Sequence, residues 1–304
     1  MRIVVVTWAR NCAATLSRAV DSVLAQSFGA FDYYLIDNAS EDNTLAIMND
    51  YSAKDERVKV IANKQNDMRV LFTLLPDLYE RYSDDDALII LDADDEYTPD
   101  CFQSLTDFLG AKDFVCCGTD IINSETGQLI EQRICAAANN PFFTQIYNYL
   151  RTFWGKLIPF RTLKRCEFDI PEKMIYGIDT LFALEVYKRS ETYGVLPGTH
   201  HRYYLSQGSV SYRFDPLRFT WDCIAANKAY DALISKHELT TMNNNFIREV
   251  RYSAAWDTIR ATRLSGNGRK LPGMFLKSAM FLIFPLDAFM HIFYKIWRKH
   301  YESN

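Results

Sequence analysis

"LIILDADDEYTPD", residues 88–100, is the stretch of this chain that decides the fold. It starts with four apolar residues suited to a buried strand and continues into Asp92, Asp94 and Asp95, with Glu96 next. Like charges this close repel one another, and removing any of them from water is unfavourable. Either these carboxylates point into water, or a cation binds among them.

The residues before this stretch alternate between two kinds of apolar pattern. Short apolar runs predict strands, and longer runs with helical spacing predict helices, the last of them in spite of Pro76. The expected strands are 2–7, 31–37, 58–63 and 87–92, and the expected helices are 13–26, 41–53 and 69–82. This alternation is typical of βαβ units, so we expect an α/β fold with a mainly parallel, Rossmann-like sheet flanked by helices.

Three polar loops follow the first, second and fourth expected strands. In open α/β sheets, ligands bind outside the carboxyl ends of the strands, where such loops meet. The loops are "TWARN" (7–11), "DNASED" (37–42) and "DADDE" (92–96). We therefore expect one crevice lined by all three, with the acidic loop beside the ligand.

The pattern changes after residue 98. Residues 113–122 and 128–134 resemble strands of a hairpin or mixed sheet, and 200–213 a strand followed by a polar loop. Helical spacing appears at 144–153 and 177–189, and only helices are expected from about residue 216. The sequence thus predicts an α/β domain over 1–215 and a helical C-terminal extension over 216–304.

The bulk composition excludes several classes of protein. A chain of 304 residues with 48% apolar content can build a large core, and its net charge of −4 argues against a general nucleic-acid binder. Its seven cysteines are odd in number and lack C-x-x-C spacing, which favours reduced thiols of the cytosol over a disulfide framework. The start, "MRIVVVTWAR", does not have the pattern of a signal peptide.

The acidic loop has the chemistry of a site for a hard divalent cation. Mg²⁺ and Mn²⁺ take oxygen ligands, commonly one or two carboxylates together with substrate phosphates. Asp92 and Asp94 form a D-x-D motif and can reach one ion only if the strand has given way to a turn. A lone D-x-D is common, however, and more often is a solvated acidic turn.

Three segments of the first hundred residues together resemble the inverting family-2 glycosyltransferases with the GT-A fold. "NCAATLSRAVDSVLAQSF" (11–28) is similar to the family's N-x-x-x-x-L…SV-x-x-Q segment, and "FDYYLIDNASEDNT" (31–44) to its D-D-G-S-x-D-x-T stretch. "LDADDEYTPD" (91–100) is similar to L-D-x-D-D-x-x-x-P. Weaker matches follow in "FWGKLIPFRTLK" (153–164), "YGIDTLF" (176–182) and "YYLSQGSVS" (203–211).

The resemblance implies roles for the residues that match. Asp37 would receive the uracil or ribose of a sugar nucleotide, Arg69 would lie near the nucleotide or sugar, and Asp92 would contact ribose or sugar. Asp94 would bind the metal, Mn²⁺ or Mg²⁺, and Asp95 would support the sugar or the shape of the site. Alternatives stay open, because Asp37 could merely cap a helix and Arg69 could be a surface cation.

The same resemblance makes Asp179 the catalytic base, although it could be only an acid at a helix N-terminus. It also puts Trp8, Arg10 and Asn11 at the nucleotide, where the family usually has P-x-Y-N. Two further positions depart from the family: Asn38 replaces the second acid of D-D-G-S, and Ile178 replaces the acid before the base.

A metal and a single base define one reaction. The metal neutralises the leaving diphosphate, and the base takes the proton of the acceptor hydroxyl on the opposite face of the sugar. We therefore expect an inverting glycosyltransferase of the hexosyltransferase type over 1–215, with a UDP-sugar as donor. One alternative is a nucleotidyltransferase on a related fold, for which "TWARN" lacks the phosphate loop. Another is an inactive sugar-binding or scaffold protein. His200 or His201 could reach the diphosphate, or could be a plain strand-edge histidine.

The last 37 residues, 268–304, combine aromatic and basic side chains. They carry six Lys and Arg against two acids, a net charge of +4, which leaves −8 on the rest of the chain. Such a segment suits an anionic membrane surface, or else packs as a helix on the domain. We expect a peripheral enzyme at the cytoplasmic face of the cell membrane. Its acceptor would be a saccharide or a polyprenyl-diphosphate-linked saccharide of cell-surface polysaccharide biosynthesis.

Overall fold

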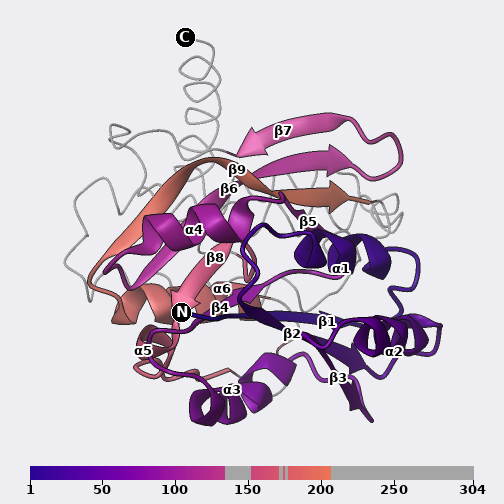
Figure 1. The fold of residues 1–304 in the computed structure, drawn as a ribbon, viewed down its shortest axis with the longest axis horizontal. Coiled ribbons are helices and arrows are strands. Elements are labelled where there is room, and N and C mark those ends of the chain that lie inside the picture. The colour runs from indigo at the N-terminus through magenta and orange to yellow at the C-terminus, as the bar shows by residue number, and fades with distance from the viewer. Residues whose placement is uncertain (134–151, 171–173, 175–176, 207–304) are drawn as a thin grey trace, which may run out of the picture. The chain divides into compact units, whose positions relative to one another are not determined.

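The computed structural model describes residues 1–133, 152–170, 174 and 177–206 (Figure 1). Its strands form one sheet in the order β3-β2-β1-β4-β8-β6-β9-β5, with β7 paired to β6. The described residues, apart from Met174 and Gly177, belong to one compact unit. The expected boundary between 215 and 216 and the helices expected beyond it lie outside the described residues.

The N-terminal half of the sheet is parallel, as the alternating pattern predicted. Its four strands pair in the order β3-β2-β1-β4. They are β1 (Ile3–Ala9), β2 (Phe31–Asn38), β3 (Val58–Asn63) and β4 (Ala87–Ile90). The fourth strand ends two residues before the expected position, because the chain turns once Leu91 N has donated to Val6 O (3.1 Å). Asp92 therefore already stands on a turn.

The second half of the sheet is mixed. Strand β8 (Lys156–Pro159) runs antiparallel to β4 and to β6 (Phe114–Asn123), while β9 (Tyr193–Leu205) is parallel to β6. The short β5 (Glu96–Tyr97) pairs antiparallel with β9, and β7 (Leu129–Arg133) with β6. Because β5 directly follows the acidic turn, its pairing brings β9 to that turn.

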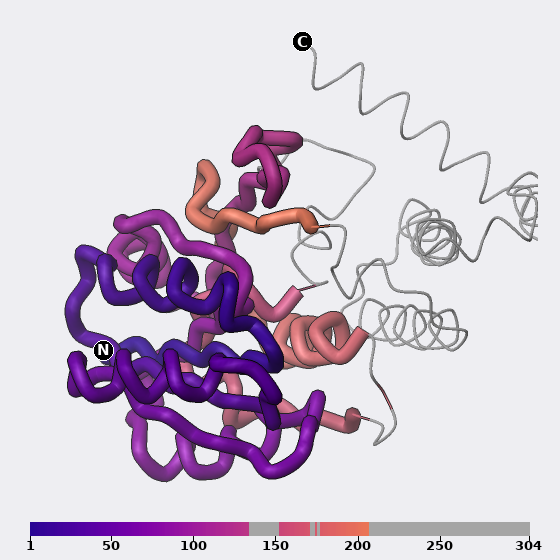
Figure 2. The backbone as a smooth tube through the Cα atoms, turned by 90° about the vertical axis from the view of Figure 1, so that its right-hand side faces the viewer, coloured from indigo at the N-terminus to yellow at the C-terminus, as the bar shows by residue number. Residues whose placement is uncertain are grey.

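Helices cover both faces of the sheet (Figure 1). Helices α1 (Leu16–Leu24), α2 (Thr44–Lys54) and α4 (Cys101–Leu109) bury apolar side chains in one core cluster with alternate residues of β1, β2 and β4. In Figure 1, α3 (Val70–Arg81) and α5 (Phe160–Leu163) lie on the opposite side of the sheet from α1 and α4. The last described helix is α6 (Ile178–Arg189). In Figure 2 the indigo-to-purple part of the chain forms a contiguous layered body.

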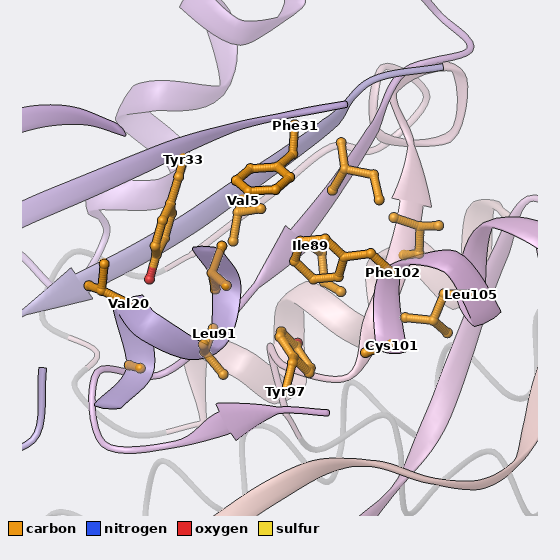
Figure 3. Close-up of a cluster of buried hydrophobic side chains, with 14 of the residues drawn as sticks. Val5, Val20, Phe31, Tyr33, Ile89, Leu91, Tyr97, Cys101, Phe102 and Leu105 are labelled. Atoms are coloured by element: carbon orange, nitrogen blue, oxygen red, sulfur yellow. The ribbon is translucent and has the colours of Figure 1, made fainter. Parts of the chain in front are cut away.

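Two tyrosines, Tyr33 and Tyr97, lie within the buried apolar cluster (Figure 3), and their hydroxyls are hydrogen bonded. Tyr33 is fully buried and its hydroxyl lies 3.0 Å from Thr7 Oγ1, while Tyr97 donates to Ile90 O at 2.7 Å. The Tyr97 hydroxyl also accepts from Gly155 N (2.9 Å), which ties the start of β8 to the end of β4. Phe102 of α4 packs on Tyr97 with ring centroids 5.8 Å apart.

Some sequence expectations need comment. Most of the helix expected at 144–153 lies outside the described residues, and its last two residues, Thr152 and Phe153, are not helical. Strand β9 begins at Tyr193, seven residues before the expected position, and α4 and β8 were not expected at all. Within the described part of the chain, no helix is both long enough and apolar enough to cross a membrane.

Candidate active site

The acidic loop forms a tight turn at the end of β4. Asp95 N donates to Asp92 O at 3.2 Å, and the Asp95 side chain is fully buried. Its Oδ1 accepts from Tyr204 N of β9 at 2.9 Å. Glu96 accepts from Tyr204 Oη (3.0 Å) and from Arg202 (3.2 Å). Asp95 and Glu96 thus hold β9 in place, whereas Asp92 and Asp94 remain partly exposed.

The carboxylates of this turn resist ionisation. Burial raises the pKa of Asp92 well above its usual value, and the charges of Asp95, Asp94 and Asp179 raise it further. Burial also raises the pKa of Asp94, and that of Asp95 even more, where the Asp94 charge adds to the effect. The described residues around this turn therefore supply too little positive charge to keep all of its carboxyl groups ionised.

Arg18 of α1 is a cation that the described structure places against this turn. Its Nη2 donates to the Asp94 carbonyl oxygen, and its Nε lies 3.8 Å from Glu96 Oε1. The guanidinium carbon stands 3.6 Å from the centroid of the Tyr204 ring, a cation–π distance. Its charge lowers the pKa of Asp94 and of Asp95, though less than burial raises them. Nothing in the sequence alone distinguished this arginine.

One of the two histidines lies at the cluster. His201 is fully buried, stacks on Trp154 with centroids 4.2 Å apart, and has its Nε2 3.4 Å from Asp95 Oδ2. Burial lowers the pKa of His201 to about 3, so the ring is neutral at neutral pH and this contact is not an ion pair. His200 instead faces Thr98 and Asp100, with Nδ1 3.3 Å from Thr98 Oγ1.

Lys156 is a buried cation that the sequence analysis did not select, although it stands in the quoted "FWGKL" segment. Only 1% of it is exposed, and its Nζ donates to Thr152 O (2.6 Å), Thr152 Oγ1 (3.0 Å) and Trp154 O (3.2 Å). Burial lowers its pKa to about 8, with the charge of Asp179 among the opposing influences. These bonds use all three ammonium protons and hold the turn that carries Trp154.

Asp179 lies in the first turn of α6, as expected. Its Oδ1 accepts from Thr180 N at 2.8 Å, near the positive end of the helix dipole. Its charge raises the pKa of Asp92. Asp92 and Asp179, 87 positions apart in the chain, therefore interact electrostatically. Asp94 and Asp95 also act on Asp92, so the four acids form one group.

The end of β2 carries a different kind of polar group. Asp37 is 3% exposed; its Oδ2 accepts from Ser40 N at 3.2 Å, and its Oδ1 has no hydrogen-bond partner within the described chain. A buried carboxylate oxygen without a donor is unfavourable unless a ligand or water supplies one. The free oxygen of Asp37 can therefore accept a hydrogen bond from water or from a ligand.

The first loop is tied to the second. Asn11 N donates to Ser40 Oγ (3.0 Å) and Asn11 Oδ1 accepts from Glu41 N (2.8 Å). The Arg10 guanidinium forms an exposed ion pair with Glu41 at 3.3 Å. Asn11 and Ala39 both have positive φ, 55° and 60°, a conformation that is costly for alanine. Backbone strain is thus concentrated at these two loops.

An aromatic chain leads from the first loop to α6. Trp8 meets Phe153 edge-on with centroids 5.0 Å apart, and Phe153 lies 5.2 Å from Phe182. Phe182 stands three residues after Asp179 on the same helix. Trp8 is therefore linked by direct packing to the helix that carries Asp179.

The last of the expected residues, Arg69, lies just before α3. Its Nε is 3.4 Å from Asp67 Oδ1, and about a third of its side chain is exposed. The loop that carries it is bound to the end of β2 through Asn38. The loop that carries Arg69 is thus attached to the end of β2, whereas the charge of Asp179 acts at the acidic turn.

A divalent cation fits the acidic turn only in part. In the portion of the chain that the structure describes, no three His, Cys, Asp or Glu side chains are grouped as a cation cage. Two partly exposed carboxylates with raised pKa values are nevertheless the donor set that Mg²⁺ or Mn²⁺ uses when substrate phosphates complete its coordination. Asp92 and Asp94 are the residues that could hold such an ion.

Comparison with known proteins supports the assignment of fold and family. The model of glycosyl transferase family 2 matches residues 3–170. TarS of S. aureus, solved as residues 1–349 with UDP-GlcNAc, superposes with a TM-score of 0.63 and 16% identity, covering 87% of this chain and 83% of that one. PcManGT, a mannosyltransferase of Pyrobaculum calidifontis solved with GDP-Man and Mn²⁺, gives 0.52 and 14%, covering 98% and 88%.

A sequence relative adds a shorter match. The putative glycosyltransferase EpsE of Bacillus subtilis (strain 168) is 42% identical over 57 residues, which is 18% of this chain and 20% of EpsE. The match thus spans about a fifth of the length of that relative. Together with the sheet order and the acidic turn, the family match over more than half of the chain decides the class: this chain belongs to glycosyl transferase family 2 and has the GT-A fold.

Proposed function

We propose that this chain transfers a hexosyl group from a UDP-sugar to a hydroxyl of a saccharide, with inversion at the anomeric carbon and with a bound divalent cation. The observation that carries the proposal is the group formed by Asp92, Asp94, Asp95 and Asp179, in which the other three charges raise the pKa of Asp92 and the charge of Asp94 raises that of Asp95. Family membership supports sugar transfer, and the nucleotide-sugar complexes of TarS and PcManGT support a donor of that chemistry.

We assign the two halves of the donor to two places: the nucleoside to the end of β2, and the diphosphate to the end of β4. The unpartnered Oδ1 of Asp37 accepts a hydrogen bond from the nucleoside, at the end of β2. The carboxylates of Asp92 and Asp94, at the end of β4, would hold the cation, whose chemistry there would be to neutralise charge on the diphosphate leaving group. The proposal of UDP rests on the resemblance of the Asp37 segment to the family and on TarS, which was solved with UDP-GlcNAc.

Asp179 is the residue proposed to act on the acceptor. Its carboxylate takes the proton from the acceptor hydroxyl while that oxygen forms a bond to the anomeric carbon and the bond to the diphosphate breaks. Its position at the start of α6 favours the ionised form, because the helix dipole is positive there. One base without a protein nucleophile gives a single displacement, so an α-linked donor yields a β-linked product.

We also propose where the reaction takes place. The basic, aromatic segment 268–304 would bind an anionic membrane at its cytoplasmic face, and the acceptor would be a growing surface saccharide or one carried on polyprenyl diphosphate. Truncation before Gly268 should then release the protein from anionic liposomes. Equal flotation of full-length and truncated protein would contradict this part of the proposal.

The central experiment is a thermal-shift screen of UDP, GDP, CDP and TDP, each with and without Mn²⁺. We expect UDP to raise the melting temperature, and to do so much more with Mn²⁺ present, because ligands of the folded state stabilise it by mass action. NMR of the product formed from an α-linked donor would then establish whether the new bond is β. Stabilisation by UDP that is the same without metal would contradict the metal-dependent mechanism.

A further inference from the structure

The position where this chain departs from its family at the end of β2 has a specific structural use. Asn38 stands where the family usually has an acid, directly after Asp37, and it is only 2% exposed. Its side chain makes four hydrogen bonds, one to Asn63 at the end of β3 and three to Asn66 and Asp67 just after it. The residue that replaces the acid thus donates two hydrogen bonds, which a carboxylate could not do.

The central pair of these bonds joins Asn38 to the backbone of Asp67. Asp67 N donates to Asn38 Oδ1, and Asn38 Nδ2 donates to Asp67 O, both at 3.0 Å. The carboxamide therefore pairs with Asp67 as a peptide group of a neighbouring strand would, beyond the last pair of the ladder, Asn38 with Asn63. Since a backbone N–H can only donate and a carbonyl only accept, Asp67 fixes which atom of the amide is oxygen.

Two further bonds complete the set. Asn63 Nδ2 donates to Asn38 Oδ1 at 3.3 Å, and Asn38 Nδ2 donates to Asn66 Oδ1 at 2.8 Å. Asn66 is exposed and can rotate its amide to suit another partner. The Asp67 carbonyl has no such freedom, so its bond is the one that requires a donor at position 38.

The fixed segment leads directly to Arg69. Asp67 Oδ1 accepts from Arg69 N at 2.8 Å and lies 3.4 Å from Arg69 Nε. Asn38 thus sets the place of Asp67, and Asp67 sets the start of α3 and the direction of the Arg69 side chain. All of this lies at the carboxyl end of β2, the strand that also ends with Asp37, because β2 and β3 are paired up to Asn38 and Asn63.

We propose that Asn38 is a positioning residue for the donor: it holds segment 63–69 against the end of β2, so that this wall of the nucleoside site, with Arg69 on it, exists before the donor binds. This inference rests on the proposed function. A loop that is already ordered loses no conformational entropy when the ligand binds, so the ligand binds more tightly. Asn38 itself touches the loop and need not touch the donor.

The decisive variant is Asn38→Asp, which keeps the shape of the side chain and removes both donated protons. When ionised, the new carboxylate faces the Asp67 carbonyl oxygen with no proton between them, so segment 63–69 must move away. We expect the Kd of UDP, measured with Mn²⁺ at pH 8, to rise about tenfold. The amides of Asp67 and Arg69 should exchange hydrogen faster than in the wild type.

A pH profile separates positioning from general damage. The introduced carboxyl stands at a position that is 2% exposed and faces the Asp67 carbonyl oxygen, so its pKa is raised, and lowering the pH protonates it. The protonated group can again donate to the Asp67 carbonyl. The ratio of variant to wild-type Kd should therefore shrink as the pH falls from 8 towards 5.5. A ratio that stays constant with pH, or unchanged exchange at Asp67, would overturn the proposal.

Two more variants separate the effect of the lost hydrogen bonds from the effect of the added charge. Asn43→Asp adds the same charge at an exposed position whose side chain makes no capping hydrogen bond, and it should leave the Kd and the exchange rates unchanged. Asn66→Ala removes only the adaptable partner and should raise the Kd about twofold. A rise with Asn43→Asp equal to that with Asn38→Asp would show that charge alone is responsible.

The exchange measurement does not depend on the proposed function. If the wild type binds none of UDP, GDP, CDP and TDP, the proposed function fails, and with it the role of Asn38 in donor affinity. Faster exchange at Asp67 in Asn38→Asp, but not in Asn43→Asp, would still support the fixing of the loop. Equal exchange in the two variants would refute that as well.

Discussion

The ends of β2 and β4 lie at the same edge of one sheet, yet they handle polar groups in opposite ways. At the end of β2 a single carboxylate, Asp37, stands beside Asn38, whose amide is fully hydrogen bonded. At the end of β4, Asp92, Asp94 and Asp95 crowd together with raised pKa values. Apart from one oxygen of Asp37, the side-chain polar groups at the first end are hydrogen bonded, whereas the second end carries repulsion that a bound cation would relieve.

This difference teaches which residues serve the fold and which serve the ligand. Satisfied hydrogen bonds stabilise the folded chain, while uncompensated buried charge destabilises it and persists only where something else needs it. Substitutions of Asp92 and Asp94 should therefore reduce activity without loss of stability. Substitution of Asn38 at the β2 end should cost stability as well as affinity for the donor.

The largest effect is expected from Asp94→Asn. The change removes a proposed metal ligand, so calorimetry should show that Mn²⁺-dependent binding of UDP is lost. Stability should not fall, because a carboxylate whose pKa is raised in the folded state destabilises that state when ionised. Asp107→Asn, at an exposed site on α4, is the matched control and should bind UDP normally. Unchanged metal dependence in Asp94→Asn would show that the cation binds elsewhere.

Next in size is Asp179→Asn. Removing a general base lowers kcat by about 10²- to 10⁴-fold. The affinity for the donor should hardly change, because the base acts on the acceptor. The measurement is the rate of transfer with the UDP-sugar titrated. A variant with near-normal kcat, or one that fails only because UDP no longer binds, would show that the proton goes elsewhere, and Asp95 would be the next residue to test.

A smaller effect, on stability alone, is expected from His201→Gln. The pKa of His201 is about 3 in the folded state and about 6.5 when unfolded, so the unfolded chain binds more protons between these values. Stability contributed by the neutral ring is therefore lost as the pH falls below about 6.5. The wild type should lose about 2 kcal/mol relative to the variant between pH 7 and pH 5. If the difference in free energy of unfolding between wild type and variant is the same at pH 7 and pH 5, this prediction is wrong.

Ala39→Gly should stabilise the protein. Ala39 has a φ of 60°, which costs an alanine roughly 1 kcal/mol and a glycine almost nothing. Glycine also increases the entropy of the unfolded chain, so part of the gain is offset. We expect the melting temperature to rise by about 2 °C. A fall in melting temperature would mean that the Ala39 methyl group makes contacts worth more than the strain.

The smallest effect is expected from Arg10→Ala. The ion pair with Glu41 is exposed, and such pairs contribute about 0–1 kcal/mol. The melting temperature should stay within about 1 °C of the wild type. Any weakening of UDP binding would then report contact with the nucleotide rather than damage to the fold. A clear loss of stability would show that this ion pair helps to hold the two loops together.

The parallel half of the fold could be predicted from the sequence because its signals are local. Apolar runs and helical spacing within short windows gave β1 to β4 and the helices between them. The acidic turn could be predicted for the same reason, since Asp92, Asp94 and Asp95 follow a buried strand directly. The match of "YGIDTLF" then led to Asp179, and its charge does reach Asp92 in the folded chain.

The rest depends on pairing between distant segments, which no short window contains. His200 and His201 point to opposite faces of β9, and only the register that pairs Tyr97 with His201 decides which of them lies at the cluster. Lys156 stood in a weakly matching motif and was not selected. Its three acceptors are brought to it by the fold of the loop before β8, which the spacing of residues in the sequence does not reveal. Asn38 appeared only as a missing acid, whereas its partners lie 25 to 29 residues away.

The aromatic chain from Trp8 through Phe153 to Phe182 has a consequence for the kinetics of a two-substrate enzyme. Close-packed rings transmit displacement, since there is little free volume between them to absorb it. A donor that shifts Trp8 on binding should therefore also shift the helix that carries Asp179, the residue proposed as the base. Each substrate would then alter the affinity for the other by the same factor, whichever arrives first.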